Sequence, residues 1–168
     1  MQGIDDNDIK TQLFSKEVLI SLRKIIQAID LHSKNLSKKY GLTGPQLIIL
    51  QEIAAKSRIS VTELGRAISL SQGTVTGIIS RLEKKELVYK RKSEKDKRRT
   101  ELYITEKSMR ILDNAPPPLQ ETFLEQFAEI NDWEQMMIMS SLGRIVDMME
   151  AKKIDASPIL VSGPIEDL

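Results

Sequence analysis

Residues 60–99 read SVTELGRAISLSQGTVTGIISRLEKKELVYKRKSEKDKRR, and this stretch decides the fold of the chain. It contains two apolar sets: Leu64, Ala67 and Ile68, then Val75, Ile78, Ile79 and Leu82. Spacings of three and four residues put the members of each set on one face of a helix. Ser71, in the break between them, can accept a hydrogen bond from the N–H groups that open the second helix. The stretch therefore predicts a helix–turn–helix over residues 61–85.

The other face of the second helix carries small or hydrogen-bonding side chains suited to contact DNA. These candidates are Ser71, Gln72, Gly73, Thr74, Thr76 and Gly77, with Arg81 further along. Small polar groups can approach base edges closely, whereas arginine neutralises phosphates. Exposed glutamine and threonine are also ordinary on any helix surface, so a merely solvated face is the alternative.

Two short segments rich in branched and aromatic residues follow, and each has the composition of a β-strand. Together with their link they form a predicted hairpin, or wing, over residues 87–105. Residues 90–99 contain seven basic and two acidic side chains. The basic candidates for phosphate or minor-groove contact are Arg91, Lys92, Lys95, Lys97, Arg98 and Arg99. We expect Asp96 to orient Arg98, and a hairpin that only aids solubility is the alternative.

The order of these elements, the pattern LSQGTVTGIISRLEKKELV at 70–88 and the Asp96-Lys97-Arg98 sequence of the wing resemble the MarR family of bacterial transcription regulators. The LTGPQL sequence at 42–47 also resembles the family's entry to its second helix. The resemblance implies a mainly α fold, in which a winged helix–turn–helix lobe with a small β wing is joined to N- and C-terminal helices that form a dimerisation region. It also implies a homodimer that represses by covering a pseudo-palindromic operator in double-stranded DNA, with a small-molecule effector that relieves repression.

Three positions depart from the family pattern. Glu86 stands where the family usually has glycine after the recognition helix, and a left-handed cap costs more for glutamate than for glycine. Ser108 also replaces a usual glycine, and Gly77 stands where many relatives place a long basic side chain. Residues 114–119 and 154–160 are similar to the subgroup that controls compatible-solute genes, such as those for ectoine or glycine betaine.

The remaining sequence divides into three further parts. Residues 8–40 have a long helical apolar pattern, which we expect to be shared between the helix's own lobe and a second subunit. The lobe itself is expected at 42–105. Residues 106–151 predict C-terminal dimerisation helices interrupted at Pro116-Pro117-Pro118, and residues 152–168 predict an extended or disordered tail.

Composition narrows the function classes. The chain has no cysteine, which excludes disulfides and thiol switches and fits a reducing bacterial cytoplasm. His32 is the only histidine, so we expect no metal site, no cofactor and no enzyme. No long apolar run or leader pattern predicts a membrane partner. The effector pocket is left unassigned.

Charge is unevenly distributed along the chain. Residues 57–112 carry 14 basic and 7 acidic side chains, while residues 113–168 carry 3 and 11. A basic middle predicts that this part faces a polyanion. A non-specific architectural DNA binder and a winged-helix protein-interaction module are the two competing readings of the same pattern.

Overall fold

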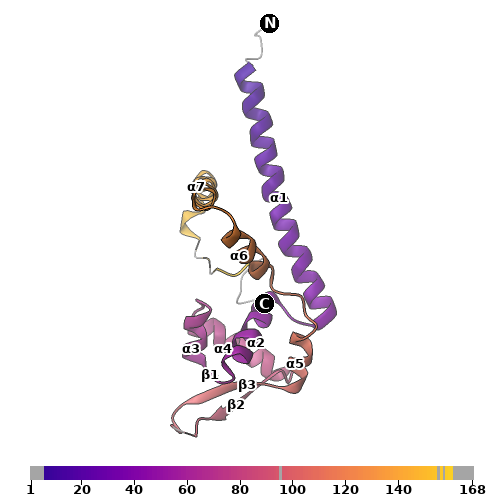
Figure 1. The fold of residues 1–168 in the computed structure, drawn as a ribbon, viewed down its shortest axis with the longest axis vertical. Helices are drawn as coiled ribbons and strands as arrows, with labels where there is room; N and C mark the ends of the chain where they lie inside the picture. The colour runs from indigo at the N-terminus through magenta and orange to yellow at the C-terminus, as the bar shows by residue number, and fades with distance from the viewer. Residues whose placement is uncertain (1–5, 95, 155, 157, 161–168) are drawn as a thin grey trace.

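The computed structural model describes residues 6–94, 96–154, 156 and 158–160. Its elements in chain order are α1 (Asp6–Tyr40), α2 (Gly44–Lys56), β1 (Ile59–Ser60), α3 (Val61–Ala67), α4 (Gln72–Lys84), β2 (Val88–Lys92), β3 (Thr100–Ile104), α5 (Glu106–Leu112), α6 (Leu119–Glu129), α7 (Asp132–Met148) and the 3-10 turn η1 (Ala151–Lys153). The mainly α winged-helix fold predicted from the sequence is confirmed (Figure 1).

The core of the lobe lies between α2, α3, α4 and a three-stranded antiparallel sheet of order β1-β3-β2. Leu102 on the central strand β3 pairs with Ile59 on one side and Lys90 on the other, and its side chain is fully buried. The inner face of α4 is equally buried, through Val75, Ile78, Ile79 and Leu82. This packing fixes the recognition helix against the rest of the lobe and leaves its other face outside.

The helix ends explain why the chain turns where it does. Gly41 ends α1 in the left-handed conformation at a φ of 66°. The backbone N–H of Thr43 donates to Oε1 of Gln46 at 3.3 Å, as the sequence predicts for the start of α2. Glu86 takes the left-handed cap after α4 at a φ of 58°, and Leu87 N donates back to Leu82 O at 2.9 Å. The cap that the family closes with glycine is therefore closed here with glutamate.

Replacing Glu86 with glycine should stabilise the protein. A residue with a Cβ costs about 1 kcal/mol or more in the left-handed region, and glycine removes that cost. We expect a gain of about 0.5–1 kcal/mol in the free energy of unfolding, measured by urea denaturation. As a control, Lys84→Gly in the last turn of α4 should destabilise by a similar amount. A loss of stability in Glu86→Gly would contradict the strain assigned to this cap.

Helix α1 rises away from the lobe, and α6 and α7 lie outside the lobe core (Figure 1). Its 35 residues make it about 52 Å long. Val18, Ile25, Leu142 and Ile145 line a shallow apolar groove where α7 meets α1. Large apolar side chains remain exposed on all three helices: Leu13, Phe14, Leu19, Ile26, Leu31, Phe123, Leu124, Trp133, Met136, Met137, Met139, Met148 and Met149.

The proline segment separates α5 from α6, since α5 ends at Leu112 and α6 begins at Leu119. The tail prediction is partly wrong, because η1 forms a helical turn at its start. Ile159 is buried, and Leu160 N donates to Oε1 of Gln120 on α6 at 3.4 Å. Residues 155, 157 and 161–168 of the predicted tail lie outside the described residues. Within the part of the chain that is described, no helix is long and apolar enough to cross a bilayer.

Candidate nucleic-acid interface

The recognition helix α4 opens on a side-chain cap. The backbone N–H of Thr74 donates to Ser71 Oγ at 3.1 Å, and the Ser71 and Thr74 hydroxyls lie 2.8 Å apart. Such a cap satisfies one of the N–H groups that a helix leaves open at its start. The hydroxyl groups of Ser71 and Thr74 thus make hydrogen bonds within the start of α4 even when no ligand is bound.

The exposed stripe of α4 differs from the predicted set of contact residues. Gln72, Thr76 and Ser80 are exposed and follow one another at intervals of four residues, which places them on one line along the helix. Ser80 was not among the predicted contact residues, although it stands four residues after Thr76 on the same face. Thr74 and Arg81 are half-buried and lie to the side of this stripe.

The two glycines of α4 leave space on its surface. Gly73 is exposed and Gly77 is half-buried, and a Cβ added at Gly77 would meet no heavy atom within 4 Å. The missing long side chain at Gly77 therefore reflects open space on the helix surface rather than a tight contact. A ligand backbone can approach this part of the helix closely.

The wing holds its basic side chains outward. Arg91, Lys92, Lys97, Arg98 and Arg99 are all exposed, and Lys95 lies outside the described residues. The guanidinium of Arg91 is 3.6 Å from the carboxylate of Glu94, but both side chains are mostly in solvent, so this pair contributes little. The exposed cations are therefore available to an incoming polyanion.

Asp96 contacts Arg98, the residue that it was expected to orient, and also lies near Arg99. Asp96 Oδ1 accepts a hydrogen bond from the backbone N–H of Arg98 at 3.0 Å, which shapes the turn at the wing tip. Its other oxygen, Oδ2, lies 3.9 Å from Nε of Arg99. Asp96 therefore contacts Arg98 through its backbone N–H and lies near Arg99 through its side chain.

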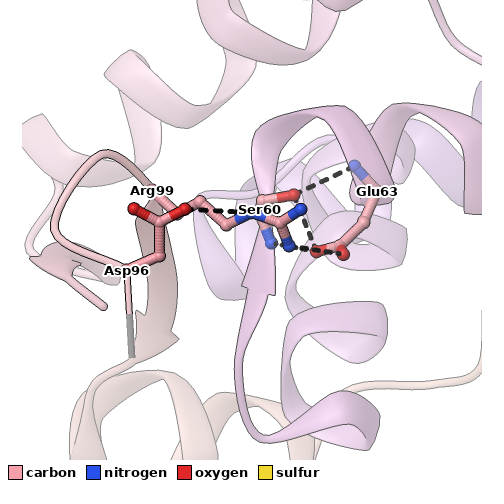
Figure 2. Close-up of polar contacts among 4 residues, drawn as sticks. All are labelled: Ser60, Glu63, Asp96 and Arg99. Carbon is pink, nitrogen blue, oxygen red and sulfur yellow. Dashed lines mark hydrogen bonds and ion pairs between the residues drawn. The ribbon is translucent and has the colours of Figure 1, made fainter. Parts of the chain in front are cut away.

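Arg99 connects the wing to the start of α3 (Figure 2). Its Nη1 lies 3.9 Å from Oε1 of Glu63, and Glu63 Oε2 accepts hydrogen bonds from the Ser60 N–H at 3.0 Å and the Ser60 hydroxyl at 2.7 Å. Ser60 in turn caps α3 by accepting from the Glu63 N–H at 3.3 Å. This reciprocal cap places Glu63 where it meets the wing, so Arg99 bridges Asp96 of the hairpin and Glu63 of the lobe.

Two open hollows flank this bridge. One, of about 430 Å³, is lined by Arg66, Arg98, Arg99 and the first turn of α3, and the other, of about 330 Å³, by Arg58, Ser93, Asp96 and Glu101. The sequence analysis did not connect Arg58 or Arg66 with the wing, since no local pattern relates residues so far apart in the chain. Arg66 extends the basic surface from the hairpin onto α3, and Arg58 adds a cation between α2 and β1.

Hydrogen bonds from Ser60 lower the pKa of Glu63 below its ordinary value of 4.5, and the charge of Arg99 acts in the same direction. On strand β3 the Tyr103 hydroxyl donates a hydrogen bond to Glu101 Oε2 at 2.7 Å. This bond lowers the pKa of Glu101 and raises the pKa of Tyr103. Both carboxylates are held in their charged form beside the wing.

Because the folded state lowers the pKa of Glu63, its carboxylate adds stability above pH 4.5 that is lost as the pH falls through the lowered value. Glu63→Gln should therefore melt below the wild type at pH 7 and approach it in acid. Thermal melts between pH 7 and pH 3 test this. In a Ser60→Ala background the difference should shrink, because the main donor is gone. A wild-type advantage that is the same at every pH would contradict this account.

No group of three or more His, Asp or Glu side chains within the described ranges could hold a metal ion. His32 is half-buried on α1. The chemistry that the lobe offers is thus hydrogen bonding and positive charge.

Comparison with known proteins agrees with this architecture. Residues 42–100 match the model of the MarR family. The HTH-type transcriptional regulator SarZ of Staphylococcus aureus is 33% identical over 97 residues, which cover 58% of this chain and 63% of SarZ. The chain therefore matches slightly less than two thirds of that relative's length. These matches to named transcription regulators support the prediction that the chain is not an enzyme.

Two solved structures share the fold. The S. aureus MepR–DNA complex aligns with a TM-score of 0.55 and 16% identity over 81% of this chain and 97% of MepR. A structure of Bordetella bronchiseptica BpsR, whose DNA binding is regulated by 6-hydroxynicotinic acid, aligns with a TM-score of 0.55 and 22% identity over 80% of this chain and 96% of BpsR. Together, the family-model match over residues 42–100, the similarity to SarZ and the shared fold show that this chain carries a winged-helix lobe similar to those of the MarR family.

Proposed function

We propose that this protein is a sequence-specific transcription regulator that binds double-stranded DNA as a homodimer. The observation that carries the proposal is the pairing of two exposed surfaces. One is the polar stripe on α4, and the other is the set of exposed cations on the wing: Arg91, Lys92, Lys97, Arg98 and Arg99. The stripe suits a major groove and the wing suits the flanking backbone or minor groove. The DNA bound by MepR supports the same use of this fold here.

The homodimer is supported by the apolar side chains that α1, α6 and α7 leave exposed. Leu19 and Ile26 are 62% and 58% exposed on α1, and Met139 is 66% exposed on α7. So many large apolar side chains exposed on neighbouring helices are unusual on a monomer, and burial in an interface would stabilise them. Two copies related by a two-fold axis would present two recognition helices to half-sites about 34–36 Å apart, so the operator would be pseudo-palindromic.

Repression and its relief by a small molecule form the next part of the proposal. A dimer that covers a promoter excludes polymerase without further parts. An open hollow of about 660 Å³ lies between the end of α1 and α5, lined by Tyr40, Arg110, Ile111 and Asn114 among others. Its size is in the range of small-molecule sites, and the ligand regulation of BpsR supports an effector of this kind.

The proposed target genes follow from the compatible-solute subgroup that residues 114–119 and 154–160 resemble. Pull-down of sheared genomic DNA with the purified protein, washed at low and at moderate salt, tests this. Enrichment of a few promoters with an inverted repeat at moderate salt supports the regulator, and solute-synthesis or solute-uptake genes beside them support the osmotic link. Uniform recovery that vanishes with salt would instead indicate an architectural DNA binder, and no recovery a protein-interaction module.

Two variants should separate backbone contacts from base contacts. Arg98→Ala should weaken binding to the enriched duplex and to random DNA alike and reduce the salt slope, because an arginine on the wing acts mainly by charge. Gln72→Ala should weaken binding to the enriched duplex by about 5- to 150-fold and hardly change binding to random DNA. Titration of both duplexes by fluorescence anisotropy measures these ratios. Wild-type affinity and selectivity in both variants would show that the contact surface lies elsewhere.

A further inference from the structure

The end of the recognition helix is tied to the end of α1 by one side chain. Lys85 follows the last residue of α4, and its Nζ donates to the backbone carbonyl of Gly41 at 2.6 Å. The same ammonium donates to Oε1 of Gln46, on the first turn of α2, at 3.1 Å. These partners are 44 and 39 residues away in the sequence, so the contact joins three separate helices.

The position of the ammonium has a clear electrostatic reason. A helix carries partial negative charge at its C-terminus, where carbonyl groups lack partners within the helix. α1 and α4 both end beside Lys85, and its ammonium supplies hydrogen bonds and positive charge there. Gln46 is itself 1% exposed and accepts from Thr43 N–H at 3.3 Å, so it is a fixed partner. The lysine is held by groups that cannot move independently of the lobe and of α1.

The opposite side of the same helix end is anchored to α5. Nζ of Lys107 donates to the backbone carbonyl of Lys85 at 2.8 Å, and the Thr105 hydroxyl donates to the carbonyl of Glu86 at 2.9 Å. The buried hydroxyl of Ser108 donates to the carbonyl of Leu87. The serine that replaces the family's glycine therefore adds a donor at this junction. With α5 as the anchor on one side, Lys85 provides the connection to α1 on the other.

We propose that Lys85 is a positioning residue that transmits the position of α1 to the recognition helix. The inference rests on the proposed function, because α1 carries part of the proposed dimer face and α4 the proposed base contacts. In a dimer the distance between the two α4 helices depends on how each lobe sits on its α1. A hydrogen-bonded link between the two helix ends restricts that angle, and so restricts the half-site spacing that the dimer accepts.

Lys84 provides a matched control. It stands one residue earlier, has the same charge and is exposed on α4. Loss of its charge removes one cation from the DNA-facing lobe without touching the junction with α1. Lys85→Met removes both donated hydrogen bonds and keeps a side chain of similar length, and Lys85→Arg restores donors at the same place. Lys84→Met, Lys85→Met and Lys85→Arg together separate the effect of losing a positive charge from the effect of losing the contact with α1.

The test uses the full chain and a duplex enriched by the wild type from a randomised library, with the spacer between half-sites changed by one or two base pairs. Wild type should bind the best spacing at least about 10-fold more tightly than its neighbours. Lys85→Met should reduce that ratio at least about 3-fold with an unchanged salt slope, and Lys85→Arg should restore it. Lys84→Met should keep the ratio, and a lost phosphate contact would lower its salt slope by about 0.9.

Amide hydrogen exchange gives a second readout that needs no DNA. Lys85→Met should speed exchange at least about 3-fold in residues 37–43 and 81–87, with the core strands unchanged. If no duplex is enriched, the proposed function fails. The hydrogen-exchange measurement then decides by itself whether Lys85 connects α1 to the recognition helix. Unchanged exchange overturns the proposal, as does a Lys85→Met variant that keeps the wild-type spacing ratio. A Lys85→Met variant that only loses salt slope also overturns it, because Lys85 would then be a phosphate contact.

Discussion

Replacing Ile26 with glutamate should split the proposed dimer into monomers and abolish tight operator binding. Ile26 is 58% exposed on α1, on the same helical line as the exposed Leu19. A carboxylate buried in an apolar interface without a partner costs several kcal/mol, which exceeds what two subunits can recover elsewhere in the interface. We expect the dissociation constant of the dimer to rise by at least about 100-fold, that is, by at least about 2.7 kcal/mol.

The control for this prediction is Gln27→Glu. Gln27 is the next residue of α1, is exposed and is already polar, so the new carboxylate remains in water. Sedimentation velocity over a range of concentrations measures the association state of both variants, and circular dichroism checks that each retains its helices. If Ile26→Glu associates as tightly as Gln27→Glu, this face of α1 is not the dimer interface.

Replacing Leu82 with alanine should destabilise the lobe by about 2–5 kcal/mol, since it leaves a cavity in a closely packed core. Leu82 is fully buried in the last turn of α4, and its carbonyl accepts the hydrogen bond from Leu87 N–H that closes the cap. The loss should therefore be larger than a surface effect and should also loosen the end of the recognition helix. Urea denaturation at one fixed protein concentration measures it, since the stability of a dimer depends on concentration.

Lys84→Ala serves as the matched control on the same turn. Its side chain is exposed, so the change should alter the free energy of unfolding by no more than about 0.5 kcal/mol. A Leu82→Ala variant as stable as Lys84→Ala would mean that the end of α4 does not pack as the buried side chains indicate. It would also weaken the inference about Lys85, which depends on the same helix end being fixed.

The sequence by itself was enough to locate the elements of the lobe. The apolar spacing of α4 and the serine cap before it depend on residues within a few positions of one another. The two strands of the wing were equally readable from their branched and aromatic residues. Such signals are local, because a helix face, a cap or a hairpin is decided by neighbours along the chain.

Which side chains face outward and which ones meet was decided only by the tertiary structure. Thr74 was predicted as a contact residue but is half-buried, while Ser80, which was not predicted, is exposed. Asp96 accepts from the backbone N–H of Arg98, while the side chain of Arg99 lies 3.9 Å from both Asp96 and Glu63, a proximity that no local pattern indicated. These outcomes depend on the angles at which helices and hairpin pack, and no local pattern of residues specifies those angles.

The same reason explains the two junctions that matter most for function. Arg99 reaches Glu63 and Lys85 reaches Gly41 across 36 and 44 residues of sequence, and in each case a flexible cation finds an acceptor on another element. The sequence alone showed these residues only as surface charges suited to phosphates. The packed core brings the carboxylate and the carbonyl within reach, so tertiary packing determines which of the exposed cations also have a partner on another element.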